Sequence, residues 1–202
     1  MFLRLTNYRS VVFNTNMTTK EEIINALLSL GEEKGLANVS LADIALEVGI
    51  RKASIYSHFE SQQALTDAAM SYCAQLLSQR EFTVDFNAPD AGSLIYSLAD
   101  SFLQTFTEAP LSSYYSIIHQ QMLFDPAFSA LNDRLESMLT ARVRVALEFC
   151  VQRGWLDIPD TDIAADFFSS ALTDALRTTL SGESDYSLRL ERLTEGLVAL
   201  FS

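Results

Sequence analysis

The chain has 202 residues with a formal net charge of −12, and 49% of the residues are hydrophobic. This length allows one or two domains with a substantial buried core. Only 4 Pro and 7 Gly are present and alternating β-branched runs are few, so we predict an all-α fold. No stretch approaches the ~20 apolar residues that a membrane-spanning helix needs, so we expect no such helix.

The cysteines and the start of the chain indicate the cell compartment. Cys73 and Cys150 fall in helical patterns without metal-ligand spacing, so we expect buried thiols in a reducing cytoplasm. The apolar residues around Phe2 are interrupted too early to make a secretory signal. We therefore expect a cytoplasmic protein without a membrane partner.

Residues 1–17 show no helical periodicity, and we expect them to form a flexible arm. Two interpretations of this arm remain open. Either it is an extension ahead of a natural start at Met17, or Arg4 and Arg9 lie along a DNA backbone or in a minor groove.

The first expected helix covers 19–34. Thr18 and Glu21 have the spacing of a capping box at its start, and Gly35 is placed to end it. Its packing face consists of apolar and small side chains at helical spacing, namely Ile23, Ile24, Leu27, Leu28 and Gly31.

Residues 40–59 are predicted to form two short helices joined at Gly49. Ser40 is a good N-cap, and Asp43 completes a capping-box-like pair. Gly49 supplies the left-handed backbone conformation that ends such a helix and turns the chain. The first of the two helices has a single apolar stripe, formed by Leu41, Ile44, Ala45 and Val48.

The second of these helices is expected to begin near Lys52 and to have a polar face. Its only large apolar residues are Ile55 and Phe59, four positions apart, so one side is buried. Such a pair of helices is typical of a helix-turn-helix, whose second helix lies in the DNA major groove. The polar face carries hydrogen-bond donors of modest length: Arg51, Lys52, Ser54, Tyr56, Ser57 and His58.

The run from Gly49 to Phe59 resembles the DNA-reading segment of TetR-family transcriptional regulators. An ending of the form aromatic-x-His-aromatic, Tyr56-Ser57-His58-Phe59, follows the turn glycine at a fixed distance. The resemblance extends from about Glu21 to Met70. It implies that this segment reads DNA.

The same resemblance implies the domain organisation. An N-terminal three-helix helix-turn-helix DNA-binding domain, at 18–60, would precede a C-terminal helical ligand-binding and dimerisation domain, at 61–202. In the family, the first helix of the second domain joins the two and moves when ligand binds. We expect that helix at 61–80.

We expect Arg51 or Lys52 to contact guanine edges or phosphates. Shorter side chains beside them would contact bases or a thymine methyl group, and three further groups would position the phosphates. The proposed base contacts are Ala53, Ser54 and Ser57, and the proposed phosphate contacts are Tyr56, His58 and Ser40.

The charge is unusual for a DNA-binding protein, because such domains usually carry a basic patch. Residues 1–70 have a net charge of −2, and residues 71–202 have −10. Two positions also depart from the family pattern: Gln62 stands where lysine is usual, and Ala42 where a polar or charged side chain is common. We therefore expect weak non-specific binding and a relatively large share of base readout.

The last two expected helices, 160–180 and 184–201, have wide apolar stripes. A two-fold pairing would make a four-helix interface, as in the family; alternatively, both stripes pack within the chain. We favour the homodimer, since one reading helix contacts too few base pairs alone. The stripes are Ile163, Ala164, Phe167, Phe168, Ala171, Leu172, Ala175, Leu176, Thr179 and Leu180, and then Tyr186, Leu190, Leu193, Leu197 and Leu200.

The expected middle helices, 93–108, 112–124 and 126–153, are rich in aromatic and polarisable side chains. The family resemblance implies a small-molecule pocket here, and apolar walls with few polar groups suit such a pocket. Simple core packing is the alternative for each residue, and His119 is either a ligand contact or an ordinary core or surface histidine. The candidate ligand-binding residues are Phe102, Phe106, Tyr115, His119, Met122, Phe149, Trp155 and Phe168.

Catalysis is not indicated. The chain has two histidines, and it lacks a nucleophile elbow, a P-loop and a dinucleotide-binding glycine pattern. We expect no enzyme activity, no cofactor and no metal site.

The predicted function is that of a ligand-responsive transcriptional regulator, in the first place a repressor. It would bind a pseudo-palindromic double-stranded DNA operator as a homodimer, and an unidentified small-molecule effector would release it. The alternative is a helical protein-interaction module of the same fold with weak or lost DNA binding.

Overall fold

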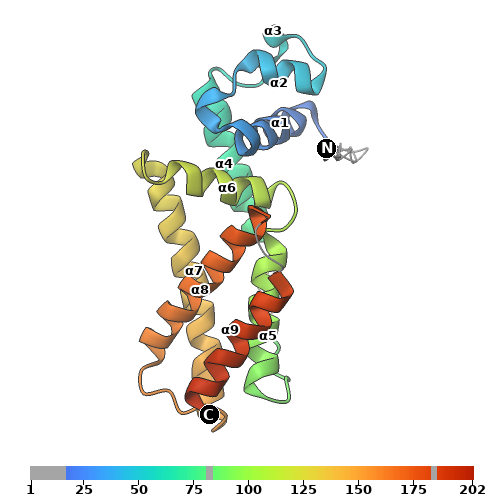
Figure 1. Ribbon diagram of the computed structural model, residues 1–202. Coiled ribbons are helices and arrows are strands. Elements are labelled where there is room, and N and C mark those ends of the chain that lie inside the picture. Colours follow the sequence, from blue (N-terminus) through green and yellow to red (C-terminus); the bar gives the residue numbers. More distant parts are fainter. Residues whose placement is uncertain (1–16, 81–83, 183–185) are drawn as a thin grey trace, which may run out of the picture.

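A computed structural model describes residues 17–80, 84–182 and 186–202; of the arm predicted at 1–17, residues 1–16 lie outside them. The described residues are all-α, which confirms the predicted fold class (Figure 1). Their α-helices are α1 Thr19–Lys34, α2 Leu41–Val48, α3 Lys52–Ile55, α4 Gln62–Ser78, α5 Ala91–Thr105, α6 Leu111–Gln121, α7 Pro126–Gln152, α8 Thr161–Leu180 and α9 Tyr186–Phe201, with a 3₁₀ turn at Leu36–Asn38. None of these helices is long and apolar enough to cross a membrane.

Helices α1–α3 form a small head at one end of the molecule (Figure 1). Thr18 caps α1 with the predicted capping box: the Glu21 amide donates to the Thr18 hydroxyl, and the Glu21 carboxylate accepts from the Thr18 amide at 2.8 Å. Ile23 and Leu27 of α1 are fully buried, and α1 packs against both α2 and α4. The head has few fully buried side chains, and they form one continuous cluster with those of the rest of the molecule. A core this small would contribute little stability alone.

Helices α4 and α6 lie between the head and an elongated bundle of α5, α7, α8 and α9 (Figure 1). The contact between α1 and α6 is close, because a Cβ added at Gly31 would lie 3.0 Å from Ile117 Cδ1. Beside it, the Glu32 carboxylate accepts hydrogen bonds from Ser113 Oγ at 2.6 Å and from Ser116 Oγ at 3.2 Å. The head is therefore attached to the bundle through α6 as well as through α4.

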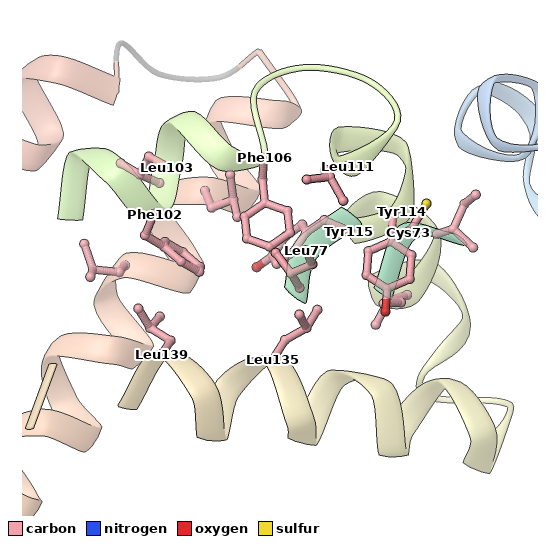
Figure 2. Close-up of a cluster of buried hydrophobic side chains, with 14 of the residues drawn as sticks. Cys73, Leu77, Phe102, Leu103, Phe106, Leu111, Tyr114, Tyr115, Leu135 and Leu139 are labelled. Carbon is pink, nitrogen blue, oxygen red and sulfur yellow. The ribbon is translucent and has the colours of Figure 1, made fainter. Parts of the chain in front are cut away.

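Aromatic side chains fill the interior where α4, α5, α6 and α7 meet (Figure 2). Phe106 is fully buried between Phe102 and Tyr115, and both ring centroids lie 5.3 Å from its own. Leu135 and Leu139 of α7 lie on the other side of this row of rings. Side chains of this size bury more area than any others, so this row contributes strongly to the stability of the bundle.

The predicted stripes of α8 and α9 pack mainly within the chain. Phe168, Leu172 and Leu176 are buried where α8 lies along α7, and Leu190 of α9 is fully buried as well. A smaller apolar set faces outward, consisting of Ile163 and Phe167 on α8 and Leu188 and Leu200 on α9. A two-fold partner would therefore have only this outer set to contact.

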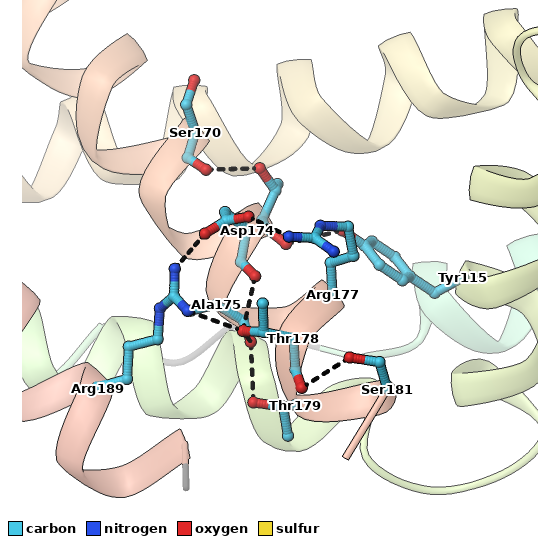
Figure 3. A network of polar contacts seen from close by, with 10 residues as sticks. Tyr115, Ser170, Asp174, Ala175, Arg177, Thr178, Thr179, Ser181 and Arg189 are labelled. Atoms are coloured by element: carbon cyan, nitrogen blue, oxygen red, sulfur yellow. Dashed lines mark hydrogen bonds and ion pairs between the residues drawn. The ribbon is translucent and has the colours of Figure 1, made fainter. Parts of the chain in front are cut away.

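Polar contacts hold α8 to α9 (Figure 3). The Arg189 guanidinium pairs with the Asp174 carboxylate and also donates to the Thr178 hydroxyl at 3.0 Å. A further hydrogen bond joins α8 to α6: the Tyr115 hydroxyl donates to the Thr173 carbonyl at 3.2 Å. These contacts fix which side of α9 faces α8.

Candidate nucleic-acid interface

The turn between α2 and α3 has the geometry that the sequence predicts. The Asp43 amide donates to the Ser40 hydroxyl, and the Asp43 carboxylate accepts from the Ser40 amide at 2.9 Å. That backbone hydrogen bond, with the Lys34 ammonium 3.0 Å away, lowers the pKa of Asp43 to about 2. Gly49 then has a left-handed φ of 76°, which an L side chain rarely adopts, and the chain turns into α3.

The reading segment, residues 51–59, is shorter in α-helix than expected. Regular α-helix covers only Lys52–Ile55, after which the amides of Ser57 and His58 bond three residues back. The segment is thus one α-helical turn followed by a tighter turn. Ile55 is fully buried and Phe59 is 5% exposed, so the predicted apolar side faces the head.

The polar side of the reading segment faces solvent. Of the eight residues predicted to contact DNA, seven are exposed and Ser54 is half-buried. Two hydroxyls already have local partners: Ser57 Oγ donates to the Ser54 carbonyl at 2.6 Å, and Ser40 Oγ donates to Asp43 at 2.8 Å. The exposed set is Ser40, Arg51, Lys52, Ala53, Tyr56, Ser57 and His58.

Gln62, where the family pattern usually has lysine, has a structural contact. Its side-chain amide donates to the Val39 carbonyl at 2.7 Å, which attaches the start of α4 to the segment before α2. Lys34 is paired with Asp43, and the Lys20 ammonium lies 5.5 Å from the centre of the Phe59 ring. Arg51 and Lys52 are therefore the cations that the reading segment itself presents.

Comparison with known proteins identifies this segment. The family model of the bacterial regulatory proteins of the tetR family matches residues 23–69, which include α2, the Gly49 turn and α3. Residues 23–69 are a TetR-family DNA-binding segment. The resemblance seen in the reading segment is thereby confirmed.

Two curated relatives match over a part of the chain. The chain is 37% identical over 59 residues to IcaR, the HTH-type negative transcriptional regulator of the biofilm operon icaADBC of Staphylococcus aureus; the match covers 29% of this chain and 32% of IcaR. It is 42% identical over 53 residues to YerO, an uncharacterized HTH-type transcriptional regulator of Bacillus subtilis, covering 26% and 18%. The matched segment thus spans about a third of IcaR and less of YerO.

Solved structures show the same fold over most of the chain. A Saccharomonospora viridis protein in complex with choline matches with a TM-score of 0.73 and 19% identity over 90% of this chain and 96% of that one. MexZ, a repressor responsible for antibiotic resistance in Pseudomonas aeruginosa, matches with a TM-score of 0.66 and 19% identity, covering 90% and 93%. At these identities, the likeness shows the fold alone.

The predicted ligand-binding residues of this TetR-family protein lie in more than one place. Phe102, Phe106, Tyr115 and His119 form a continuous row, in which the Tyr115 and His119 ring centroids are 4.3 Å apart. Burial lowers the pKa of His119, which favours the neutral form of its imidazole. The row is well packed, and the structure gives it a clear role in the core.

The other predicted ligand-binding residues have no ring contact with this row among those that the structure describes. Phe149 and Trp155 form a second aromatic cluster with Phe86, and the Arg153 guanidinium lies over both the Phe149 and Trp155 rings. Met122 is half-buried at the end of α6, and Phe168 is buried on α8. The prediction of ligand-binding residues relied on aromatic content, which does not distinguish the row around Phe106 from the cluster around Phe149.

Two functional features escaped sequence reasoning. One is the attachment of Glu32 to Ser113 and Ser116, which are more than 80 positions away in the chain. The other is the contact of Gln62 with Val39. Neither had a signal in the sequence, because each depends on which helices meet in the folded molecule. Among the described residues, no cluster of acidic, histidine or cysteine side chains suits a metal ion.

Proposed function

We propose that this TetR-family protein is a ligand-responsive transcriptional repressor that binds a pseudo-palindromic operator as a homodimer. The observation that carries the proposal is the two-sided reading segment: Ile55 and Phe59 are buried, while Arg51, Lys52 and Tyr56 are exposed. A segment that only closed a core would have no need of that polar side. The negative regulator IcaR, which is similar over 59 residues of the chain, favours repression.

The DNA contact is tested by changing one hydroxyl. Tyr56 is 53% exposed, so Tyr56→Phe removes a hydrogen bond without disturbing the core. If the hydroxyl donates to a phosphate, affinity falls about fivefold for every duplex sequence, since such a bond contributes roughly 1 kcal/mol. Fluorescence anisotropy with several duplexes measures this. Weakening at a single base position would contradict the phosphate role.

The proposed dimer uses the outward-facing set on α8 and α9. Phe167 is 74% exposed, and Ile163 and Leu188 are exposed as well, which is the kind of apolar patch that marks an interface. We infer that a second copy of the chain covers it and places two reading segments on one duplex.

Phe167→Glu is expected to convert the dimer to a monomer, because it places a charge in the centre of that patch. Sedimentation velocity measures the change, and binding to a palindromic duplex should fall to that of a half-site. Phe124→Glu is the matched control, since Phe124 is 84% exposed at the turn between α6 and α7. A Phe167→Glu protein that stayed dimeric would rule out this interface.

The proposed response to a small molecule needs a path from the bundle to the head. Both α4 and α6 connect them, and the bonds of Glu32 to Ser113 and Ser116 make α6 a direct contact of α1. A ligand that binds one arrangement of these helices more tightly shifts the equilibrium by that difference in affinity. The similar Saccharomonospora viridis protein, which is solved with choline, supports a small-molecule effector.

The second candidate function is a protein-interaction module that has lost useful DNA binding. It is favoured by the acidic balance of the chain and by Gln62, whose side-chain amide is engaged with Val39 rather than free for a phosphate. Glu47 and Glu60, both exposed, add negative charge on either side of the reading segment. Binding without sequence preference, or none, would favour this candidate.

A further inference from the structure

A groove of about 590 Å³ lies between α5 and α9, which pack side by side in the bundle (Figure 1). Tyr96 lines it from α5, together with the first turn of that helix, and Val198 lines it from α9. Two carboxylates, Glu191 and Glu195, complete its lining from α9. The groove is thus part apolar and part acidic.

The two carboxylates are one helical turn apart and project on the same side of α9. Among the described residues, neither has an ion pair, and no cation lines the groove. Arg192 is three residues before Glu195 on the same helix, but among the described residues it forms no ion pair with that carboxylate. A ligand in the groove would therefore meet negative charge that the protein itself leaves uncompensated.

Thr194 supplies an independent indication that the groove binds a ligand. Its side chain lines the groove and is 4% exposed, and its hydroxyl has no hydrogen-bond partner among the residues that the structure describes. A buried hydroxyl without a partner is unfavourable, and most such groups in folded proteins are satisfied. A polar group of a ligand seated above Thr194 would supply the partner.

The groove lies away from α8 and borders the proposed dimer face. Arg189 points to α8, where it bonds Asp174 and Thr178 (Figure 3). Glu191 is two residues further on, and so roughly 200° around the helix. Leu188, which belongs to the proposed dimer face, is three residues before Glu191 and lies roughly 60° from it around the helix, so the groove borders that face.

We propose that this groove binds an organic cation that carries an aromatic or apolar portion. Its ammonium group lies between the carboxylates of Glu191 and Glu195, and its apolar portion lies against Tyr96 and Val198. The ring and the carboxylates both attract a cation. Such a ligand contacts α9, the helix that carries part of the proposed dimer face.

The test uses three probes that share one aromatic group: 2-phenylethylammonium, 2-phenylethanol and phenylacetate. They are titrated into the full-length ¹⁵N-labelled protein without DNA, and amide shifts of Gly92, Ser93 and Thr194 report the place of binding. The cation is expected to bind about tenfold more tightly than the alcohol, and the anion more weakly than either. Added salt should weaken only the cation's advantage.

Variants assign the effect to the groove. Glu191→Gln with Glu195→Gln is expected to weaken the cation about tenfold and leave the alcohol unchanged. Thr194→Val, which keeps the side chain's shape, is expected to weaken binding about threefold. Asp133→Asn with Glu148→Gln, which neutralises two exposed carboxylates on α7, is the charge-matched control and should have no effect.

Several outcomes would overturn the proposal: equal affinity for the three probes, no saturation by about 10 mM, or unchanged affinity in the double variant or in Thr194→Val. Only the role of the groove as an effector site rests on the proposed regulatory function. Because the titration contains no DNA, failure to bind the cation and failure to bind an operator are separate results.

Discussion

Replacing Arg51 and Lys52 together by alanine is expected to weaken binding to operator DNA about a hundredfold. Both side chains are exposed at the start of α3, and the reading segment presents no other cation. Each contact to a base edge or phosphate contributes roughly 1–3 kcal/mol, and each phosphate contact adds about one unit to the salt slope. Anisotropy titrations at several salt concentrations measure both quantities.

The salt slope separates the two roles open to these residues. If both meet phosphate, the slope falls by about two units and all sequences lose affinity alike. If one reads a guanine, discrimination relaxes at that base position and the slope changes less. Arg134→Ala with Arg142→Ala changes the net charge equally from exposed positions on α7, and serves as the control. Equal losses in both double variants would mean that only overall charge matters.

Replacing Phe106 by alanine is expected to lower the free energy of unfolding by about 3–5 kcal/mol. Phe106 is fully buried between Phe102 and Tyr115, so truncation leaves a cavity that these rings cannot fill without moving (Figure 2). Urea unfolding followed by circular dichroism, at fixed protein concentration, measures the loss.

Phe124→Ala is the matched control for that experiment. Phe124 is 84% exposed, so the same truncation is expected to change stability by less than about 0.5 kcal/mol. If Phe106→Ala cost no more than Phe124→Ala, the row of rings would be a loosely packed pocket wall rather than a core. That result would restore the interpretation of Phe106 as a ligand contact.

Local signals predicted the head well. Ser40 with Asp43 and Thr18 with Glu21 form capping boxes as their spacing indicates, and Gly49 has the left-handed backbone that a helix end followed by a sharp turn requires. These features depend on residues three to nine apart, so the sequence contains all the information needed. The helix boundaries of the bundle also lie within a few residues of those predicted.

Non-local features could not be predicted in the same way. The prediction that α8 carries an apolar stripe was correct. Periodicity, however, gives only the width of such a stripe and not the element that covers it. In the structure α8 packs along α7, and Phe168 is buried whereas its neighbour Phe167 is exposed. Likewise, Phe106 and Phe149 are both aromatic, yet they belong to separate clusters. The groove between α5 and α9 combines residues that are about a hundred positions apart.

The departure at Gln62 shows how a missing charge can have a structural reason. From the sequence, glutamine there signified only a lost phosphate contact. In the structure its amide bonds the Val39 carbonyl and orients the first turn of α4 against the head. Gln62 therefore makes a contact within the protein at a position where the usual lysine would contact a DNA phosphate. Because glutamine is uncharged, this position adds no positive charge to the head, which is acidic in part for that reason.

Selection of duplexes from a random pool by the purified full-length protein tests the central claim most directly. Two reading segments related by a two-fold axis predict an enriched pseudo-palindrome, whose half-sites lie about 10 base pairs apart or a multiple of that. Recovery of such a sequence would establish both the reading segment and the pairing of two copies. Recovery of unrelated duplexes, or of single half-sites without a fixed spacing, would contradict the dimeric repressor.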